Sequence, residues 1–254
     1  MDEKSIAWIT ALKCSEEGAQ IVLSNAPVAM RMGEINKLAE KINAPVIACD
    51  VSNGEDVENL IIKTMEHFGG GFDFILHSIG MSLNVRKGKH YTEIDYTHNL
   101  KTFEISSMSL HRVLAACMRH DALNEWGSVV ALTYIAAQRV FPDYNEMADA
   151  KSLLESVARS FGYHYGVKKH VRINTVSQSP TRTTAGSGVK GFDGFISYAE
   201  KMSPLGNASA EDCGNYCVTL FSDLTRMVTM QNLFHDGGFS NTGVTSGVIE
   251  QMEK

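Results

Sequence analysis

The chain has 254 residues, of which 44% are hydrophobic and 20% are charged, and these values predict one large domain with a substantial core. The net charge is −6 and no run of five or six like charges occurs, which favours a small-molecule partner over a nucleic acid or a membrane surface. No apolar run could span a bilayer, and the opening residues include acidic groups where a secretion signal needs basic ones. We therefore expect a cytoplasmic protein.

Apolar runs rich in β-branched residues alternate along the chain with longer stretches of helical period. Strands are predicted at residues 20–25, 45–49, 72–78, 127–133, 171–177 and 232–236. Helices are predicted at residues 4–17, 28–42, 55–68, 94–120, 145–167 and 208–222. This alternation is typical of an α/β fold, in which helices cover both faces of a doubly wound parallel sheet.

Local signals support two helix ends and one loop. Ser52 or Asn53 can cap the helix predicted from residue 55, and Gly18 suits a left-handed stop after the first helix. The stretch 180–205 has no clear strand and carries four glycines, so we expect an inserted loop there, with a substrate lid over about 186–205.

The five cysteines are odd in number and scattered, which argues against a disulfide framework. Cys213 and Cys217 are four residues apart and so share one face of the last predicted helix. No nearby histidine completes a metal site. We therefore interpret this pair as small buried side chains and expect no metal.

Tyr144 and Lys151 lie seven residues apart at the start of the helix predicted over 145–167. Seven residues is close to two helical turns, so the two side chains are expected on one face. A nearby ammonium favours the phenolate, which would lower the pKa of Tyr144 and improve the phenol as an acid. Such pairs also arise by chance in many helices, so the surrounding sequence has to decide.

Residues 133–151 read TYIAAQRVFPDYNEMADAK. This segment resembles the enoyl-acyl carrier protein reductases, a divergent branch of the short-chain dehydrogenase/reductase family. In that branch six residues separate the catalytic tyrosine from the lysine, as they separate Tyr144 from Lys151. A second tyrosine stands ten residues before the first, and here it is Tyr134. The resemblance implies that all three residues are catalytic.

Further segments of the chain match the same family. They include HSIG at 77–80, SPTRTTA at 179–185 and HDGGF at 235–239. Taken singly, such segments have plain explanations, such as a helix cap at Asp50 or simple turns at Pro180 and Gly237. Taken together and in order, they imply a Rossmann-like NAD(P)-binding domain over residues 1–254. The implied cofactor contacts are Ser5, Ile6, Asp50, Val51, Ser78, Ile79, Gly80, Lys151, Thr181, Arg182, Thr183, Thr184 and Ala185.

The resemblance also implies a reaction. NAD(P)H would deliver hydride to the β-carbon of a trans-2-enoyl thioester on acyl carrier protein, a step of fatty-acid elongation. Tyr144 would stabilise the enolate and help to supply the proton, while Lys151 would hold the nicotinamide ribose. Tyr134 would help to place the substrate.

Substrate contacts are implied at Ser82, Met147, Phe192 and Phe195, the last two on an apolar lid helix that could equally be an ordinary amphipathic helix. NADH is favoured because the resembled branch mostly uses it. NADPH stays open because the residues at and just after the end of the first predicted strand, 23–27, are neither acidic nor basic. A homotetramer is implied by the family alone.

The opening of the chain departs from the family pattern, because the sequence starts at a helix without the usual strand and glycine turn. We expect Met1 to be an internal methionine, with about a dozen residues upstream. The chain as written should then be unstable or altered. Two alternatives are a degenerate non-catalytic paralogue that binds a partner and, less favoured by the wide Tyr–Lys spacing, another short-chain ketone or alcohol reductase.

Overall fold

Parallel strands form the centre of the molecule in a computed structural model that describes residues 2–31, 34–181 and 192–253, with only the backbone of Phe192. The strands are β1 (Leu23–Asn25), β2 (Val46–Ala48), β3 (Phe72–His77), β4 (Leu123–Thr133), β5 (Arg172–Gln178) and β6 (Asn232–His235). Every hydrogen-bonded pair of strands is parallel. All six predicted strands are present, and the α/β class is confirmed.

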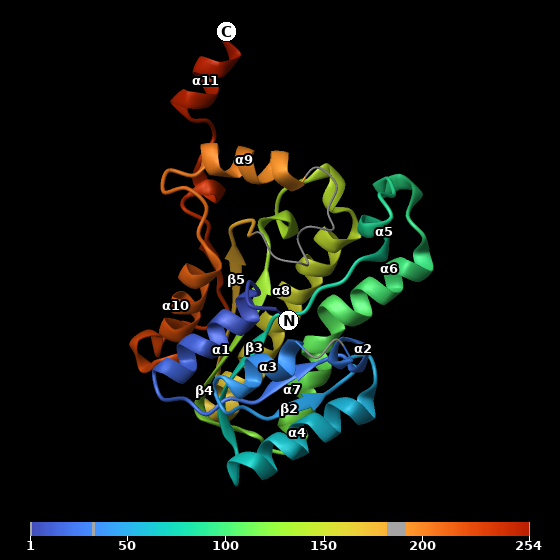
Figure 1. The fold of residues 1–254 in the computed structure, drawn as a ribbon, viewed down its shortest axis with the longest axis vertical. Coiled ribbons are helices and arrows are strands. Elements are labelled where there is room, and N and C mark those ends of the chain that lie inside the picture. Colours follow the sequence, from blue (N-terminus) through green and yellow to red (C-terminus); the bar gives the residue numbers. More distant parts are fainter. Residues whose placement is uncertain (1, 32–33, 182–191, 254) are drawn as a thin grey trace.

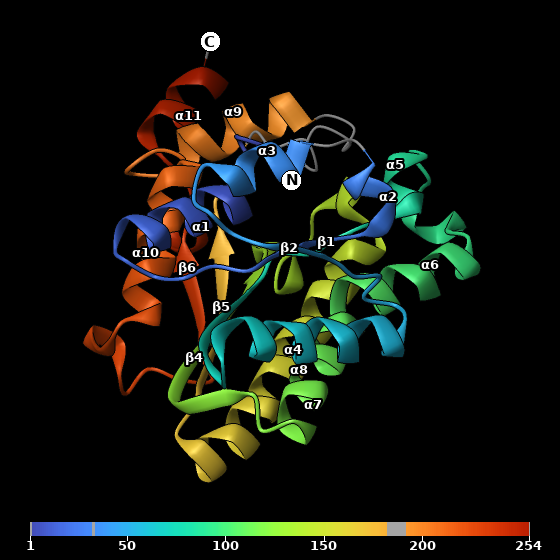
Figure 2. The same cartoon turned by 60° about the horizontal axis from the view of Figure 1, so that its bottom comes forward.

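Helices alternate with the strands and cover both faces of the sheet (Figure 1). They are α1 (Ile6–Glu16), α2 (Pro27–Met30), α3 (Glu34–Glu40), α4 (Gly54–Phe68), α5 (Leu83–Arg86), α6 (Tyr96–Phe103), α7 (Ser109–Arg119), α8 (Glu146–Lys169), α9 (Phe192–Met202), α10 (Ala210–Phe221) and α11 (Ser246–Met252). Figure 2 shows α4, α7 and α8 grouped on one side, and α1 beside α10 on the other. Within the described ranges, no helix is long and apolar enough to cross a membrane.

Strand β4 shows how the core is divided between the two faces. Val129 and Ala131 pack into a cluster with α4, α7 and α8, whereas Val130 packs against Cys213 and Cys217 of α10. Successive side chains of a strand point to opposite faces, so a strand buried on both faces is apolar throughout. Both cysteines are fully buried free thiols, which agrees with their interpretation as small core side chains.

The sheet is divided into two parts. β1 pairs only with β2, and the other four strands form a second sheet in the order β3-β4-β5-β6. No ladder joins β1 to β3 among the residues described here. The doubly wound parallel arrangement predicted from the sequence is present, in two hydrogen-bonded parts. Side chains of β1 and β3 are largely half-buried, whereas those of β5 are all buried. The missing family strand and the internal methionine stay predictions.

Several element boundaries differ from the predicted ones. The helix predicted over 28–42 is two short helices, α2 and α3, and the strand predicted over 20–25 is reduced to β1. The helix predicted over 94–120 is continuous except for a π-helical turn, Glu104–Met108, between α6 and α7. Asn53 caps α4 as predicted, and Gly18 has a φ of +88° at the end of α1. Ser52 does not cap α4, since Asn53 occupies that position, and the Ser52 hydroxyl donates to Oδ1 of Asp50.

Candidate active site

A short turn, rather than a helix, positions Tyr144. Residues Pro142–Tyr144 form a 3₁₀ turn, and α8 begins only at Glu146. Asn145 between them has a φ of +46° and its side-chain amide donates to the carbonyl oxygen of Lys89; asparagine tolerates positive φ better than most residues. The prediction that helical periodicity alone places Tyr144 on one face with Lys151 is therefore wrong. A bend at Asn145 sets the direction of the phenol.

Lys151 is buried in the second turn of α8, 7% exposed. Its ammonium donates to the carbonyl oxygen of Leu132, at the end of β4, over 2.7 Å. A Cβ atom at Gly80, just after β3, would lie 3.9 Å from the Nζ atom. Burial lowers the pKa of Lys151 to about 8, and the Glu155 carboxylate one turn along α8 opposes that shift. The lysine thus sits where the ends of β3 and β4 meet α8.

Tyr144 and Tyr134 lie together in an aromatic cluster. Their ring centroids are 5.1 Å apart, and Phe141 lies 5.5 Å from Tyr134. Loss of hydration raises the pKa of both phenols, and no lysine contributes to either shift. The expected lowering of the Tyr144 pKa by the Lys151 ammonium is therefore wrong. Both phenols keep their protons at neutral pH. In the described structure the Tyr134 hydroxyl is buried without a hydrogen-bond partner.

Helix α9 lies over the aromatic cluster, beyond the carboxyl end of β5 (Figure 1). The Phe195 ring meets Tyr134 edge-on at 6.2 Å and Phe141 edge-on at 5.1 Å. The helix expected in the lid is therefore present, and one of its two predicted substrate residues faces the tyrosines. The side chain of Phe192 lies outside the described residues.

Met147 and Ser82 were both predicted to contact substrate, and of the two Met147 packs against Tyr144. Met147 is buried with Val85 and Ala150, against Tyr144. The Ser82 hydroxyl donates to the Glu146 carboxylate over 2.5 Å and accepts the Val85 amide proton at 3.0 Å. That hydroxyl is therefore committed within the protein, and contact with a substrate would fall to other atoms of the residue.

Glu146 is a buried carboxyl that the sequence analysis missed. It is fully buried at the first position of α8 and accepts from both Ser82 and Thr102 through Oε1. Its Oε2 atom has no partner among the described residues. The acidic residue two positions after Tyr144 was visible in the sequence, but its burial depends on the packing of α5 and α6 against α8. Such packing has no local sequence signal.

His77 and Glu155 were also missed, and both lie close to Lys151. The His77 ring at the end of β3 shares a hydrogen bond of 2.8 Å with the Ser109 hydroxyl. Burial, and then the charge of Lys151, lower the pKa of His77 to about 3, so the imidazole is neutral. The Glu155 carboxylate accepts from Thr133 at 2.9 Å and from Asn232 at 3.2 Å, which anchors it to β4 and β6. The spacing of four between Lys151 and Glu155 was the available signal.

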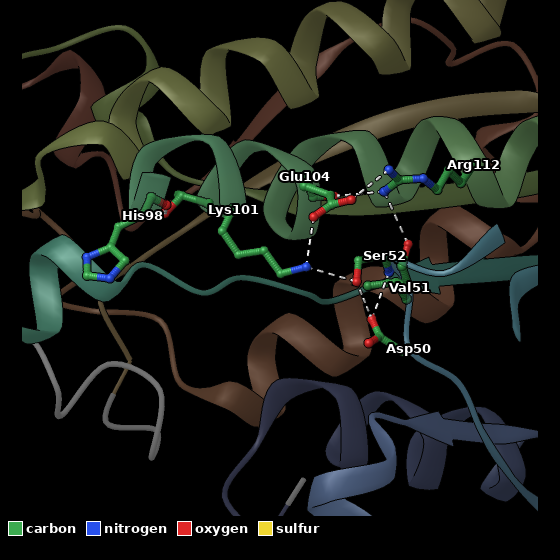
Figure 3. A network of polar contacts seen from close by, with 8 residues as sticks. Asp50, Val51, Ser52, His98, Lys101, Glu104 and Arg112 are labelled. Atoms are coloured by element: carbon green, nitrogen blue, oxygen red, sulfur yellow. Dashed lines mark hydrogen bonds and ion pairs between the residues drawn. The ribbon is translucent and has the colours of Figure 1, made fainter. Parts of the chain in front are cut away.

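The residues predicted to hold the adenine follow β2. Asp50 accepts through Oδ1 from the Ser52 amide at 2.9 Å and the Ser52 hydroxyl at 2.7 Å. These bonds, led by the hydroxyl, hold the pKa of Asp50 below its usual range, with smaller help from Lys101 and Arg112. Figure 3 shows how Lys101 and Arg112 reach this loop from the neighbouring helix. Asp50 is exposed and Val51 is half-buried.

The other predicted cofactor residues lie at helix and strand ends. Ser5 caps α1 by accepting the Trp8 amide proton at 3.3 Å, and Ile6 begins that helix. Gly80 is exposed just beyond β3, with the half-buried Ser78 and Ile79 before it. Thr181 follows β5, where its hydroxyl donates to the Ser179 carbonyl oxygen at 2.9 Å. Predicted contacts that lie outside the described residues are Arg182, Thr183, Thr184 and Ala185.

These positions belong to one edge of the molecule, because the carboxyl ends of parallel strands lie on the same side of the sheet. A helix N-terminus, a polar loop after β2, a buried lysine at the end of β4 and a pair of tyrosines beyond that strand are features expected of a dinucleotide-dependent oxidoreductase. Residues 1–240 match the family model described as enoyl-(acyl carrier protein) reductase. The chain belongs to this family.

Solved and curated relatives agree with this assignment. The crystal structure of a FabI–NADH complex from Alistipes finegoldii is 63% identical, has a TM-score of 0.95, and the match covers 96% of this chain and 86% of that one. Enoyl-[acyl-carrier-protein] reductase [NADH] 2 from Rhizobium meliloti is 32% identical over 94% of this chain and 88% of its own. A Bacillus cereus enoyl-acyl carrier protein reductase solved with NADP+ and an indole naphthyridinone is 27% identical, with a TM-score of 0.89, over 96% of this chain and 94% of that one.

Proposed function

We propose that this protein reduces the trans-2 double bond of enoyl-acyl carrier protein thioesters with NADH. The observations that carry the proposal are the contact of Tyr144 with Tyr134, just beyond β4, and the bond of Lys151 to Leu132 at the end of the same strand, in a chain that belongs to the enoyl reductase family. NADH supplies the hydride when it is bound. The protein supplies orientation, an electrophilic hydrogen bond and a proton.

Tyr144 is suited to donate a hydrogen bond to the thioester oxygen. Hydride addition at the β-carbon moves negative charge onto that oxygen, and a positioned donor stabilises the enolate. Because hydration is lost around the ring, the pKa of Tyr144 is raised, so its proton is present at neutral pH. Phe195 and Phe141 exclude water from the tyrosine pair, which strengthens such a hydrogen bond.

Lys151 is suited to orient the cofactor. Its ammonium has three donors and one is used by the Leu132 carbonyl oxygen, so others can reach the hydroxyls of the nicotinamide ribose. Gly80 stands 3.9 Å away, measured from the position that a Cβ would take. The absence of a side chain there leaves room for the nicotinamide half to approach Lys151.

The Asp50 loop fits an adenine ring. Within the described structure, no hydrogen bond occupies the Asp50 Oδ2 atom or the Val51 amide. An acceptor next to a donor matches the amino group and the ring nitrogen of adenine's Watson–Crick edge. The first turn of α1, beginning at Ile6, offers unpaired amides and a positive dipole end that suit the pyrophosphate.

We propose NADH over NADPH for a reason of charge. β1 ends at Asn25, whose side chain accepts the amide proton of Ala26 at 2.9 Å. The residues around it, 24–27, include no arginine or lysine, so nothing in that segment favours an added 2′-phosphate. A marked preference of the purified enzyme for NADPH would overturn this choice.

The experiment that tests the function follows oxidation of NADH by the purified protein with a crotonyl thioester. We expect Tyr144→Phe to lower turnover by about 100-fold or more with NADH affinity nearly unchanged, and Lys151→Ala to weaken both. Ser160→Ala, exposed on α8, serves as the control and should keep full activity. A folded wild-type protein without activity would support the non-catalytic paralogue instead. The homotetramer and the cytoplasmic location stay predictions.

A further inference from the structure

Arg112 on α7 connects two segments: the Asp50–Ser52 loop, called the adenine loop below, and Glu104 in the π-helical turn between α6 and α7. Its Nη1 atom donates to the carbonyl oxygens of Val51 and Glu104, both at 3.3 Å, and its Nη2 atom donates to the Glu104 carboxylate at 3.0 Å. The carbonyl of Val51 belongs to the peptide that follows the proposed adenine-binding amide. A guanidinium offers its donors in a fixed planar fork, so it can hold several acceptors at set directions.

Lys101 makes a second connection to the same loop, about three helical turns before Arg112. Its ammonium donates to the Ser52 hydroxyl at 3.0 Å and to the Glu104 carboxylate at 2.8 Å. The Ser52 hydroxyl in turn donates to Oδ1 of Asp50. As Figure 3 shows, Glu104 lies between the two basic side chains, and both reach down to the loop from α6 and α7.

The π-helical turn explains why Glu104 can be a firm anchor. Glu104 is the first residue of that turn, and the following residues are bound to the catalytic side of the molecule. The Ser106 hydroxyl accepts the Met81 amide proton at 2.9 Å, and the Ser107 hydroxyl donates to the Ala150 carbonyl oxygen of α8. Inserted π turns are frequent at functional sites. Here the turn is attached both to the loop after β3 and to the helix of Lys151.

We propose that Arg112 is a positioning residue for the adenine end of the cofactor: with Glu104, it fixes the Asp50–Ser52 loop at a set distance from the catalytic helix. The inference rests on the proposed function for the identity of the cofactor. Arg112 itself touches neither the reacting atoms nor, by this argument, the adenine. Its effect is to keep the loop in the binding conformation before the cofactor arrives, which lowers the ordering cost of binding.

The exposure of the Arg112 side chain argues that its ion pair with Glu104 contributes little to folding stability. The side chains of Arg112 and Glu104 are 31% and 33% exposed, and ion pairs this exposed add little to folding stability. Arg119 provides a matched comparison, because it lies on the same helix and pairs with Glu58 of α4. That pair is also partly exposed but does not contact the adenine loop.

The test compares Arg112→Met with Arg119→Met using two cofactors, NADH and reduced nicotinamide mononucleotide, which lacks the adenosine half. For Arg112→Met we expect KM and Kd for NADH to rise about threefold to tenfold with kcat unchanged, the size of one or two lost hydrogen bonds. Its kcat/KM with the mononucleotide should equal that of the wild type. Arg119→Met should match the wild type with both cofactors.

A loss of equal size with the mononucleotide, or no change with NADH, would overturn the proposal. Glu104→Gln adds a double-mutant cycle: if Arg112 acts through Glu104, the two substitutions together should cost less than the sum of each alone. Kd for NADH is measured by fluorescence without enoyl substrate. If the wild type is inactive but binds NADH, the enoyl reductase function is rejected, and the Kd values still test the positioning role. A wild-type protein that binds no NADH would overturn both.

Discussion

Lys151 and Tyr144 have pKa values shifted by burial in ways that suit different tasks. Burial lowers the pKa of the lysine to about 8 and raises that of the tyrosine, because both charged forms lose hydration. The tyrosine therefore keeps its proton across the physiological range, while the lysine is close to losing its charge under mildly alkaline conditions. The sequence predicted that Lys151 would lower the pKa of Tyr144, whereas burial sets the direction of both pKa shifts.

The activity with NADH should fall as the pH rises through about 8, where Lys151 loses its proton. The sign follows from its lowered pKa: the ammonium is present below that value and lost above it. Glu155→Gln removes a charge that supports the ammonium, so the fall in kcat/KM should move to lower pH. Lys151→Arg should move it to higher pH, since arginine stays protonated. Profiles of kcat/KM against pH that are the same for all three proteins would contradict this assignment.

Loss of the Ser82 hydroxyl should destabilise the fold. Ser82→Ala leaves the buried Glu146 carboxylate with only Thr102 and removes the cap of α5. Losing one of two hydrogen bonds to a buried carboxyl together with a helix cap should cost about 1–3 kcal/mol, and urea unfolding should show a loss of that size. The control is Ser160→Ala, whose hydroxyl bonds only within the exposed face of α8. Equal stability of the two variants would show that the Ser82–Glu146 bond contributes nothing.

The loop after β3 and the turn before α8 place the residues proposed for catalysis and cofactor binding, and neither is an α-helix or a strand. Residues between β3 and α5 bring Gly80 to Lys151, while the bend at Asn145 brings Tyr144 to Tyr134. These segments are anchored to the regular elements around them, which are β4, α8 and the π turn. Loops on a rigid scaffold commonly carry binding and catalytic groups. Sequence periodicity predicts the scaffold better than the loops.

Gly80→Ala should weaken cofactor binding without weakening the fold. An added Cβ would meet its nearest protein atoms at 3.8 and 3.9 Å, which is ordinary contact. Any loss of NADH affinity must then come from a clash between the added methyl group and the bound cofactor, and we expect the Kd for NADH to rise about threefold to tenfold. Gly127→Ala is the contrasting variant, because its Cβ would lie 2.8 Å from the Asp73 carbonyl oxygen. It should lower the melting temperature, and a stable Gly127→Ala protein would contradict this packing argument.

The molecule contains separate cores beneath its two sheets. The main cluster lies under β3 to β5 with α4, α7 and α8, whereas Trp8, Leu23, Ile35 and Leu38 form a second cluster around β1 and β2. A short two-stranded sheet has little independent stability. The Asp50–Ser52 loop follows β2, so the proposed adenosine half of the site rests on the smaller core.

Amides of β1 and β2 should exchange with deuterium faster than those of β4 and β5. The first pair belongs to a small sheet with half-exposed side chains, and the second pair is buried at the centre of the larger sheet. Local opening is easiest where apolar burial is least. Hydrogen exchange followed by mass spectrometry would measure the difference, and NADH should slow exchange in the 50–53 loop. Uniform protection of all four strands would contradict the division into two cores.

The six strands and the class of fold could be predicted from sequence because each depends on a local signal, whereas the roles of the predicted site residues stay predictions. Strand β4 is an apolar run, Asn53 is a helix cap, and the spacing of Tyr144 and Lys151 is characteristic of the family. Glu146 and Arg112 could not be predicted, because their roles depend on partners 64 and 61 residues away. The division of helix 28–42 and the π turn were missed for the same reason.

The sequence by itself determined the chemical groups of this protein: a tyrosine pair, a lysine, and glycine-bearing loops in the order of the enoyl reductase family. Only the tertiary structure decided the pKa values of these groups and the contacts that hold them in place. Burial, which sets the pKa of Lys151 near 8 and raises that of Tyr144, is a property of everything packed around a side chain. The arrangement of the π turn and the adenine loop likewise follows from contacts between distant segments, which no local pattern encodes.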